Sequence, residues 1–296
     1  MRTRTVLLGF MLGTVLILMV FGMVVLVVTT VPESSRISFS SNAVGVIDVF
    51  DVITDSRRVL EELADYRDDS SVRAIVVRID SPGGAVGPSQ EIYSEIVRTR
   101  QTKTVVASLG GMAASGGYYI ACGADMIVAN PGTLTGSIGA IMEFMNLEEV
   151  YRWARVENDV VKSGRYKDMG STNRPLTSEE RALLQEMVDD VLGQFVEAIA
   201  LGRNLSADQV RAIADGRIFT GAQAQKLGLV DRLGNFNDAV MAAAEISGID
   251  GRPRILRVKP KSVDILDLLL DSMASRFWQS MEKARVRAAR PWNLQS

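Results

Sequence analysis

Short apolar runs alternate with amphipathic stretches between residues 43 and 129, and this order constrains the fold more than any other feature. Patterning predicts strands at 43–49, 74–79, 104–109 and 126–129, and helices at 55–66 and 88–100. The run at 74–79 is interrupted only by Arg78, as in strands that are covered on both faces. The chain is therefore predicted to contain an α/β domain, which we place at residues 43–250.

Three helix-start signals recur in the second half of the chain. In each of them a hydroxyl residue precedes a Glu or Gln by three positions, which is the spacing of a capping box: Thr177 with Glu180, Ser206 with Gln209, and Thr220 with Gln223. A long helix is predicted from Ser178 to about Leu201, with an apolar face that packs against the domain. Gly202 and Gly228 are expected at helix ends.

An apolar run from Val6 to Val28 follows Arg2 and Arg4. As a helix it would reach about 35 Å, enough to cross a hydrocarbon core of about 30 Å. Because both arginines precede the run, the positive-inside rule places the N-terminus in the cytoplasm and the rest of the chain on the far side of the cell membrane. We expect a cytoplasmic tail at 1–4, an uncleaved transmembrane signal anchor at 5–31 and a tether at 32–42.

The net charge argues against a nucleic-acid-binding protein, and the cysteine content excludes a fold held together by disulfides within the chain. The formal net charge is -2, without the clustered basic face that nucleic-acid binding requires. The single cysteine, Cys122, cannot form an intramolecular disulfide and is expected to be a small buried residue.

An extension at 251–296 is predicted to form an amphipathic helix that becomes basic near Lys283. It suits a solvated helix or a subunit contact better than attraction to anionic lipid.

The chain contains no histidine, and this limits the chemistry open to Ser115. Ser115 lies in the glycine-rich segment Leu109–Tyr119, where a helix is predicted to begin near residues 112–115. Such a serine is either a nucleophile or part of a closely packed helix start, and the spacing alone leaves both interpretations open. A nucleophilic hydroxyl needs a base to take its proton. Without imidazole, the candidates are the lysines.

A lysine can accept a proton only as a neutral amine. Lowering a lysine pKa from about 10.4 to about 7.5 requires about 4 kcal/mol, which burial among apolar groups can supply. Of the seven lysines, Lys162 and Lys167 flank a connecting segment that could carry a side chain into a cleft. Position alone does not choose between these two.

A glycine-rich turn at Ser81–Gly87 lacks the Gly-Lys-Ser/Thr ending of a phosphate loop. Its uncovered amides suit a different purpose, because acyl transfer needs two N–H donors for the developing oxyanion. Gly84 and Gly116 are the predicted donors.

Several motifs in order resemble those of the signal peptide peptidase A (protease IV) family. The motifs are Asp80–Gly84, Gly111–Tyr119, Leu134–Gly139, Lys162–Asp168, and Ala214–Gly221 continuing through Gly228–Asp231. The resemblance implies the α/β fold shared by caseinolytic protease and the crotonases, and a serine peptidase with a Ser-Lys dyad. It assigns Ser115 as nucleophile, Lys167 as general base, Ser137 as the hydroxyl that orients the lysine, and Gly84 with Gly116 as oxyanion donors. Gly83 would replace Gly84 if the turn were offset by one residue.

The resemblance also implies partners and substrates. Single-domain members of the family form homo-oligomeric rings in which the serine of one protomer meets the lysine of its neighbour. The resemblance implies the same assembly for this chain. Their substrates are remnant signal peptides and other apolar segments near the lipid bilayer, and the chemistry needs neither metal nor organic cofactor. The alternatives are a catalytically silent membrane scaffold of the same fold and an acyl-CoA enzyme. The second is weakened because an anchor would export the domain away from CoA.

Overall fold

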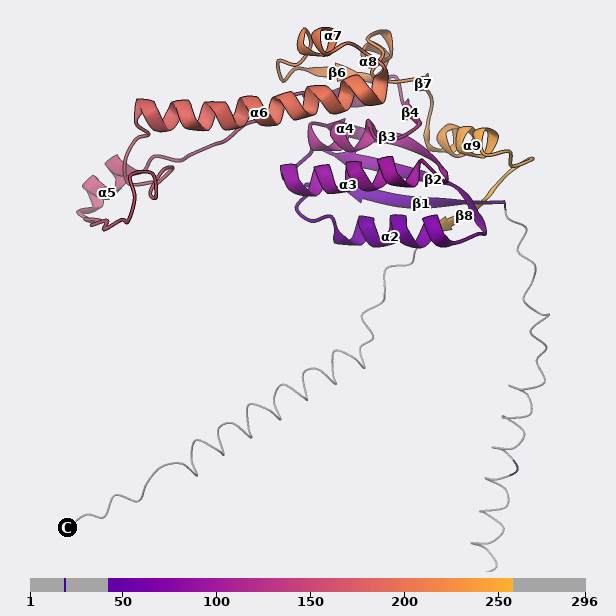
Figure 1. Ribbon diagram of the computed structural model, residues 1–296, viewed down its shortest axis with the longest axis horizontal. Helices are drawn as coiled ribbons and strands as arrows, with labels where there is room; N and C mark the ends of the chain where they lie inside the picture. The colour runs from indigo at the N-terminus through magenta and orange to yellow at the C-terminus, as the bar shows by residue number, and fades with distance from the viewer. Residues whose placement is uncertain (1–18, 20–41, 258–296) are drawn as a thin grey trace, which may run out of the picture.

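The computed structural model describes Met19 and residues 42–257, and these residues form one sheet with helices on both faces (Figure 1). The strands are β1 (Ala43–Phe50), β2 (Val72–Ser81), β3 (Thr104–Ala114), β4 (Met126–Ala129), β5 (Leu134–Gly136), β6 (Ile218–Thr220), β7 (Arg232–Leu233) and β8 (Arg254–Arg257). The helices are α2 (Arg57–Asp68), α3 (Val86–Thr99), α4 (Gly116–Ala121), α5 (Glu148–Ala154), α6 (Ser178–Arg203), α7 (Ala207–Arg211), α8 (Gly221–Lys226) and α9 (Phe236–Ile246). The predicted α/β architecture is therefore confirmed.

The sheet has the order β6-β5-β3-β2-β1-β8, and β4 with β7 branches from the first half of β3. All strand pairs are parallel except β5 with β6. Alternate residues of the strands enter two apolar clusters. Val44 and Val46 of β1 pack on the α9 side, whereas Ile47 and Val49 pack on the side of α2, α3 and α4. This covering of both faces explains the nearly unbroken apolar character of the central strands.

β3 extends five residues beyond its predicted end, so α4 begins one residue after the expected range of 112–115, with Ser115 as its N-cap. The carboxylate of Asp80 accepts hydrogen bonds from the amides of Gly111 (3.1 Å) and Met112 (3.0 Å). These bonds hold the chain extended where β3 changes its partner from β4 to β5. The helix α4 therefore begins only at Gly116, and Ser115 stands at the junction.

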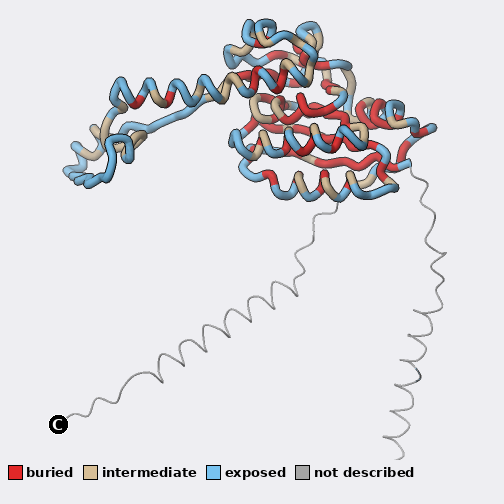
Figure 2. The backbone as a smooth tube through the Cα atoms, in the orientation of Figure 1, coloured by how far each residue is buried: buried red, intermediate tan, exposed pale blue. Residues whose placement is uncertain are grey.

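The three predicted capping boxes are confirmed at the starts of α6, α7 and α8. The C-terminal part of α6 contributes Phe195, Val196 and Ile199 to the core, but Met187 nearer its start is 51% exposed. In Figures 1 and 2 this first part of α6 projects beyond the sheet, with α5 at its tip. The expectation that the whole apolar face packs on the domain is therefore wrong for the projecting part.

The two predicted helix-end glycines have different outcomes. Gly228 follows α8 with a φ of 76°, as predicted for a residue just beyond a helix end. Gly202 lies inside α6, which continues to Arg203 and ends at Asn204 with a φ of 52°. A methyl group on Gly202 would come within 2.1 Å of the Cys122 carbonyl oxygen. Close packing, not helix termination, therefore requires this glycine.

Residues 141–177, which we call the arm, connect β5 to the projecting start of α6 and include α5. Large apolar side chains of the arm face solvent: Trp153 is 86% exposed, Val161 is 97% exposed and Ile141 is 82% exposed. Several large apolar side chains exposed on one projecting segment are typical of an interaction surface. In Figure 2 the arm is mostly pale blue, in contrast to the red strands of the body from which it projects.

No helix within the described residues is both long and apolar enough to cross a bilayer. The signal anchor expected at 5–31, apart from Met19, and the basic helix expected after residue 262 lie outside the part that the structure describes. Residues 254–257, which follow the expected domain end at 250, form β8 and pair with β1.

Candidate active site

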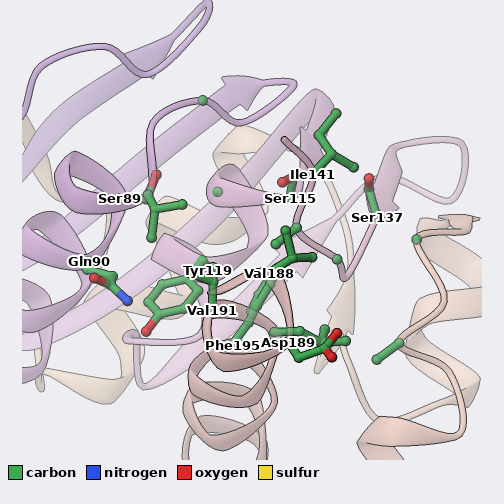
Figure 3. Close-up of a pocket in the computed structure, with 18 of the residues that line it drawn as sticks. Ser89, Gln90, Ser115, Tyr119, Ser137, Ile141, Val188, Asp189, Val191 and Phe195 are labelled. Carbon is green, nitrogen blue, oxygen red and sulfur yellow. The ribbon is translucent and has the colours of Figure 1, made fainter. Parts of the chain in front are cut away.

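A cavity of about 700 Å³ opens where β3 and β5 end, between these strands and α6. Ser115 and Ser137 both line it, as do Gly84 and Gly116 (Figure 3). Four of the five residues predicted for the site therefore meet in one cavity. They come from three separate motifs, with Ser115 and Gly116 in the same one.

Ser115 has an unusual backbone conformation, with φ at 51° and ψ at -121°. A non-glycine residue with positive φ costs roughly 1–3 kcal/mol and persists only where its surroundings impose it. Here the Ser115 amide donates to the Gly136 carbonyl (2.8 Å), and the Ser115 carbonyl accepts from the Tyr119 amide (2.9 Å). Both backbone groups are thus fixed, while the hydroxyl forms no hydrogen bond within the described residues. The side chain is held in the cavity and is free to react.

Ser137 occupies the corresponding position one strand away. Ala114 pairs with Gly136, so the residues that follow, Ser115 and Ser137, leave neighbouring strands side by side. Ser137 also has positive φ, at 49°, and its amide donates to the Arg217 carbonyl (2.8 Å). Figure 3 shows both serines on the same side of the cavity. Two constrained hydroxyls therefore line one wall.

The glycine turn supplies one free amide beside Ser115, and the hydrogen bonds favour Gly84 over Gly83. The Gly83 amide already donates to the Ser81 hydroxyl (3.1 Å), whereas the Gly84 amide has no acceptor among the described residues. A methyl group on Gly84 would lie 2.2 Å from the Ile53 carbonyl oxygen, so no other residue fits without moving the turn.

The second amide belongs to Gly116, in the first turn of α4, where helix amides have no partner within the helix. A methyl group on Gly116 would lie 3.3 Å from the Gly84 nitrogen and 2.5 Å from the Ser89 hydroxyl. The two amides are thus close neighbours beside Ser115. Such a pair can stabilise an oxyanion that forms at this serine.

Neither candidate lysine lines the cavity of its own chain. Lys167 is exposed in the arm, and its ammonium has no hydrogen-bond or ion-pair partner within the described residues. Lys162 donates to the Asp168 carboxylate (2.6 Å) and the Arg165 carbonyl (3.1 Å), so its amine is already occupied. The residues that line the cavity within the described chain include no lysine or arginine. Within one chain the cavity therefore presents Ser115 without a lysine beside it.

The opposite wall comes from α6, which sequence reasoning assigned to packing alone. Val188, Val191 and Phe195 project into the cavity from successive turns (Figure 3). Their spacing was visible as an apolar stripe, but the same stripe predicts contact with a core. Together with Tyr119 of α4 they form an apolar surface opposite the serines.

Cys122 is fully buried in the core, as predicted. Burial raises the pKa of its thiol to about 12, which leaves almost no thiolate at neutral pH. Within the described residues no group of three or more His, Cys, Asp and Glu side chains could hold a metal ion. The reactive candidate of the cavity is therefore Ser115.

Comparison with known proteins identifies the family of this chain. The model of peptidase family S49 matches residues 98–250, more than half of the chain, and that of Clp protease matches residues 47–132. Protease 4 of Salmonella typhi is 38% identical over 213 residues, covering 72% of this chain and 34% of that protein. The chloroplastic serine protease SPPA of Arabidopsis thaliana is 33% identical over 205 residues, covering 69% of this chain and 30% of that protein.

A Synechocystis sp. protein named as a candidate protease is 52% identical over 177 residues, covering 60% of this chain and 64% of that protein. The chain thus spans less than two thirds of the length of these relatives. The S49 match contains Ser115, Ser137 and the segment Lys162–Asp168, which we call the lysine loop. This chain is a member of peptidase family S49.

Proposed function

We propose that the protein is a serine endopeptidase with a Ser-Lys dyad, in which Ser115 is the nucleophile and Lys167 the general base. The observation that carries this proposal is Ser115 itself, which is held at positive φ beside the amides of Gly84 and Gly116. A serine that served only to pack a helix start would not require this strain. Ser137 is proposed to orient the lysine amine through its hydroxyl.

The proposed reaction proceeds through an acyl-enzyme. The neutral Lys167 amine takes the Ser115 proton while Oγ attacks the peptide carbonyl, and the Gly84 and Gly116 amides stabilise the resulting oxyanion. The lysine ammonium then gives its proton to the leaving amine as the C–N bond breaks. Finally, Lys167 activates a water molecule that hydrolyses the ester and restores Ser115.

Because Lys167 does not line the cavity of its own chain, we propose that a second copy supplies it. Exposed apolar residues of the arm, such as Trp153 and Val161, favour contact between chains that would carry the lysine loop to a neighbouring cavity. Because the serine and lysine surfaces differ, the contact is head to tail, and repetition of such a contact closes into a ring when the rotation between neighbours permits it. The active form would be a homo-oligomeric ring.

The proposed substrates are remnant signal peptides and other apolar peptide segments. The α6 wall of the cavity, formed by Val188, Val191 and Phe195, suits apolar side chains of an extended peptide. The signal anchor expected at 5–31 would hold the catalytic domain at the extracytoplasmic face of the cell membrane, close to such substrates.

A covalent probe separates a peptidase from a silent scaffold of the same fold. A serine-directed acylating probe should add one equivalent of mass at Ser115 in the wild-type protein, and Ser115→Ala should show no adduct and background peptide cleavage. Ser70→Ala, which changes an exposed serine far along the chain from the cavity residues, is the matched control. Full cleavage by Ser115→Ala would reject the peptidase assignment, and full cleavage by Lys167→Ala would reject the dyad.

A further inference from the structure

The residues on both sides of Lys167 are bound to the first turn of α6. The Tyr166 hydroxyl donates to Glu179, and Asp168 is linked through Arg174 to Glu180. Lys167 stands between these two attachments, and its own ammonium has no partner within the described chain. The loop is therefore fixed around a lysine that remains free.

Arg174 is the centre of these attachments. Its guanidinium donates to both Asp168 oxygens, at 3.1 and 2.9 Å, and to both Glu180 oxygens, at 2.8 and 2.6 Å. Two forked contacts to two carboxylates use the planar geometry of arginine on both of its edges. Arg174 thus joins the lysine loop directly to the helix that forms one wall of the cavity.

The two carboxylates are otherwise well enclosed. The side chain of Glu180 is only 3% exposed and that of Asp168 is 15% exposed. Hydrogen bonds from Arg174 lower the pKa of both carboxyl groups, to about 2 for Glu180. Both groups therefore stay charged across the range in which a peptidase works, and the attachment persists.

The start of α6 does not need Arg174 in order to form. Thr177 and Glu180 already complete a capping box, with the Thr177 amide donating to Glu180 (2.9 Å) and the Glu180 amide donating to Thr177 (3.2 Å). The contacts between Arg174 and Asp168 add nothing to this cap. What they fix is the loop that follows Lys162 and ends at Asp168.

We propose that Arg174 is a positioning residue that fixes the Lys167 loop on α6, so that the lysine is presented in one geometry to a neighbouring cavity. This inference rests on the proposed role of Lys167 as general base. A base that is held in reacting geometry accelerates the chemical step, and a displacement of about 1 Å can cost about 100-fold in rate. Loosening the loop should therefore lower kcat and leave substrate binding by α6 nearly unchanged.

The test compares Arg174→Ala with Arg181→Ala in the full-length protein. Arg181 is an exposed arginine in the first turn of α6, and its side chain makes no hydrogen bond or ion pair within the described residues. We expect Arg174→Ala to reduce kcat by about 10- to 100-fold with KM within about twofold, and Arg181→Ala to match the wild type. Added guanidinium, at concentrations far below those that denature, should restore part of kcat in Arg174→Ala alone.

Arg174→Lys keeps the charge but cannot contact both carboxylates in forked geometry, so it should also lose kcat. It carries the test if Arg174→Ala does not fold. Wild-type kcat in either variant overturns the proposal. So does a loss that follows a lower thermal midpoint or a dissociated oligomer and does not respond to guanidinium.

Lys167→Ala distinguishes this proposal from the one on which it rests. If Lys167→Ala is inactive while Arg174→Ala has wild-type kcat, only the positioning role fails. If Lys167→Ala is fully active, the dyad assignment itself fails.

Discussion

The cavity and the arm of one chain supply different parts of the candidate site. Both backbone groups of Ser115 are hydrogen-bonded, the supporting strands are buried, and the amides of Gly84 and Gly116 beside the hydroxyl have no acceptor among the described residues. The arm is exposed, carries large apolar side chains on its surface, and holds a lysine without a partner among the described residues. If the proposed dyad is right, the difference teaches that each folded chain carries the two halves of the site apart: a serine without a base in the cavity and a lysine without a serine in the arm.

The comparison is tested most severely by mixing two inactive chains. Ser115→Ala and Lys167→Ala, produced together in equal amounts, should assemble at random. An intact serine would then face an intact lysine at about one contact in four, which gives about a quarter of wild-type activity. Peptide cleavage by the purified mixture measures it. Ser115→Ala produced with the double variant Ser115→Ala/Lys167→Ala is the control and should stay at background, and background activity in the test mixture would mean that each chain completes its own site.

The buried core next to the cavity can be probed by the reactivity of Cys122, which lies one residue beyond α4. Burial raises the pKa of this thiol from its ordinary value of 9.0 to about 12, so the thiolate fraction at pH 8 falls roughly thousandfold. A thiol reagent should therefore label the native protein far more slowly than the urea-unfolded protein, as followed by intact mass. Rapid labelling of the native protein would show that the cavity half opens readily.

Gly84→Ala examines the oxyanion amide. The added methyl group would meet the Ile53 backbone at 2.2 Å, so the turn must shift and move the amide away from Ser115. Loss of one such donor costs about 100- to 1000-fold in kcat. Gly87→Ala is the matched control, because a methyl group there has no neighbour within 4 Å. Equal activities for the two variants would remove Gly84 from the mechanism.

A smaller effect is expected from acid, which should loosen the start of α6 at a higher pH than it loosens the sheet. Arg174 lowers the pKa of Glu180 to about 2 and also lowers the pKa of Asp168, from ordinary values of 4.5 and 3.8. Carboxyl groups with lowered folded pKa values stabilise the folded form above their ordinary values, and this contribution is lost as the pH falls through the folded values. Hydrogen exchange at the start of α6 should therefore rise below about pH 4 before exchange in the sheet does. Simultaneous opening of both regions would contradict this, and Glu180→Gln should show a weaker pH dependence.

The sequence predicted the elements whose signals are local. Long apolar runs marked the central strands, and the three hydroxyl capping boxes placed the starts of α6, α7 and α8. Strands β5, β6 and β7 have only two or three residues, too few for any periodicity, and depend on partners that are distant in the chain. Helix α9 begins with a capping box built from Asn235 and Asp238, which a search for hydroxyl residues does not find.

The candidate site was predictable where motif and position coincide, as at Ser115 and Gly84. Position alone left Lys162 and Lys167 open, and only the family resemblance chose Lys167. The contact of Lys162 with Asp168, which supports the same choice, lies inside an irregular loop and leaves no sequence pattern. The end of β3 was also missed, since the Asp80 carboxylate that keeps it extended acts across 31 or 32 residues of sequence. Side-chain contacts between distant segments leave no periodic pattern.

The projecting part of α6 is a lever. From Phe195 in the core to Ser178 at its start the helix spans about 26 Å at 1.5 Å per residue, so a tilt of about 5° at the base moves its tip by about 2 Å. Because Ile199 packs in the core at the base of this helix, its packing would influence the position of Lys167, the proposed general base, at the far end. Volume changes in that part of the core should be read out as altered catalysis in a neighbouring subunit.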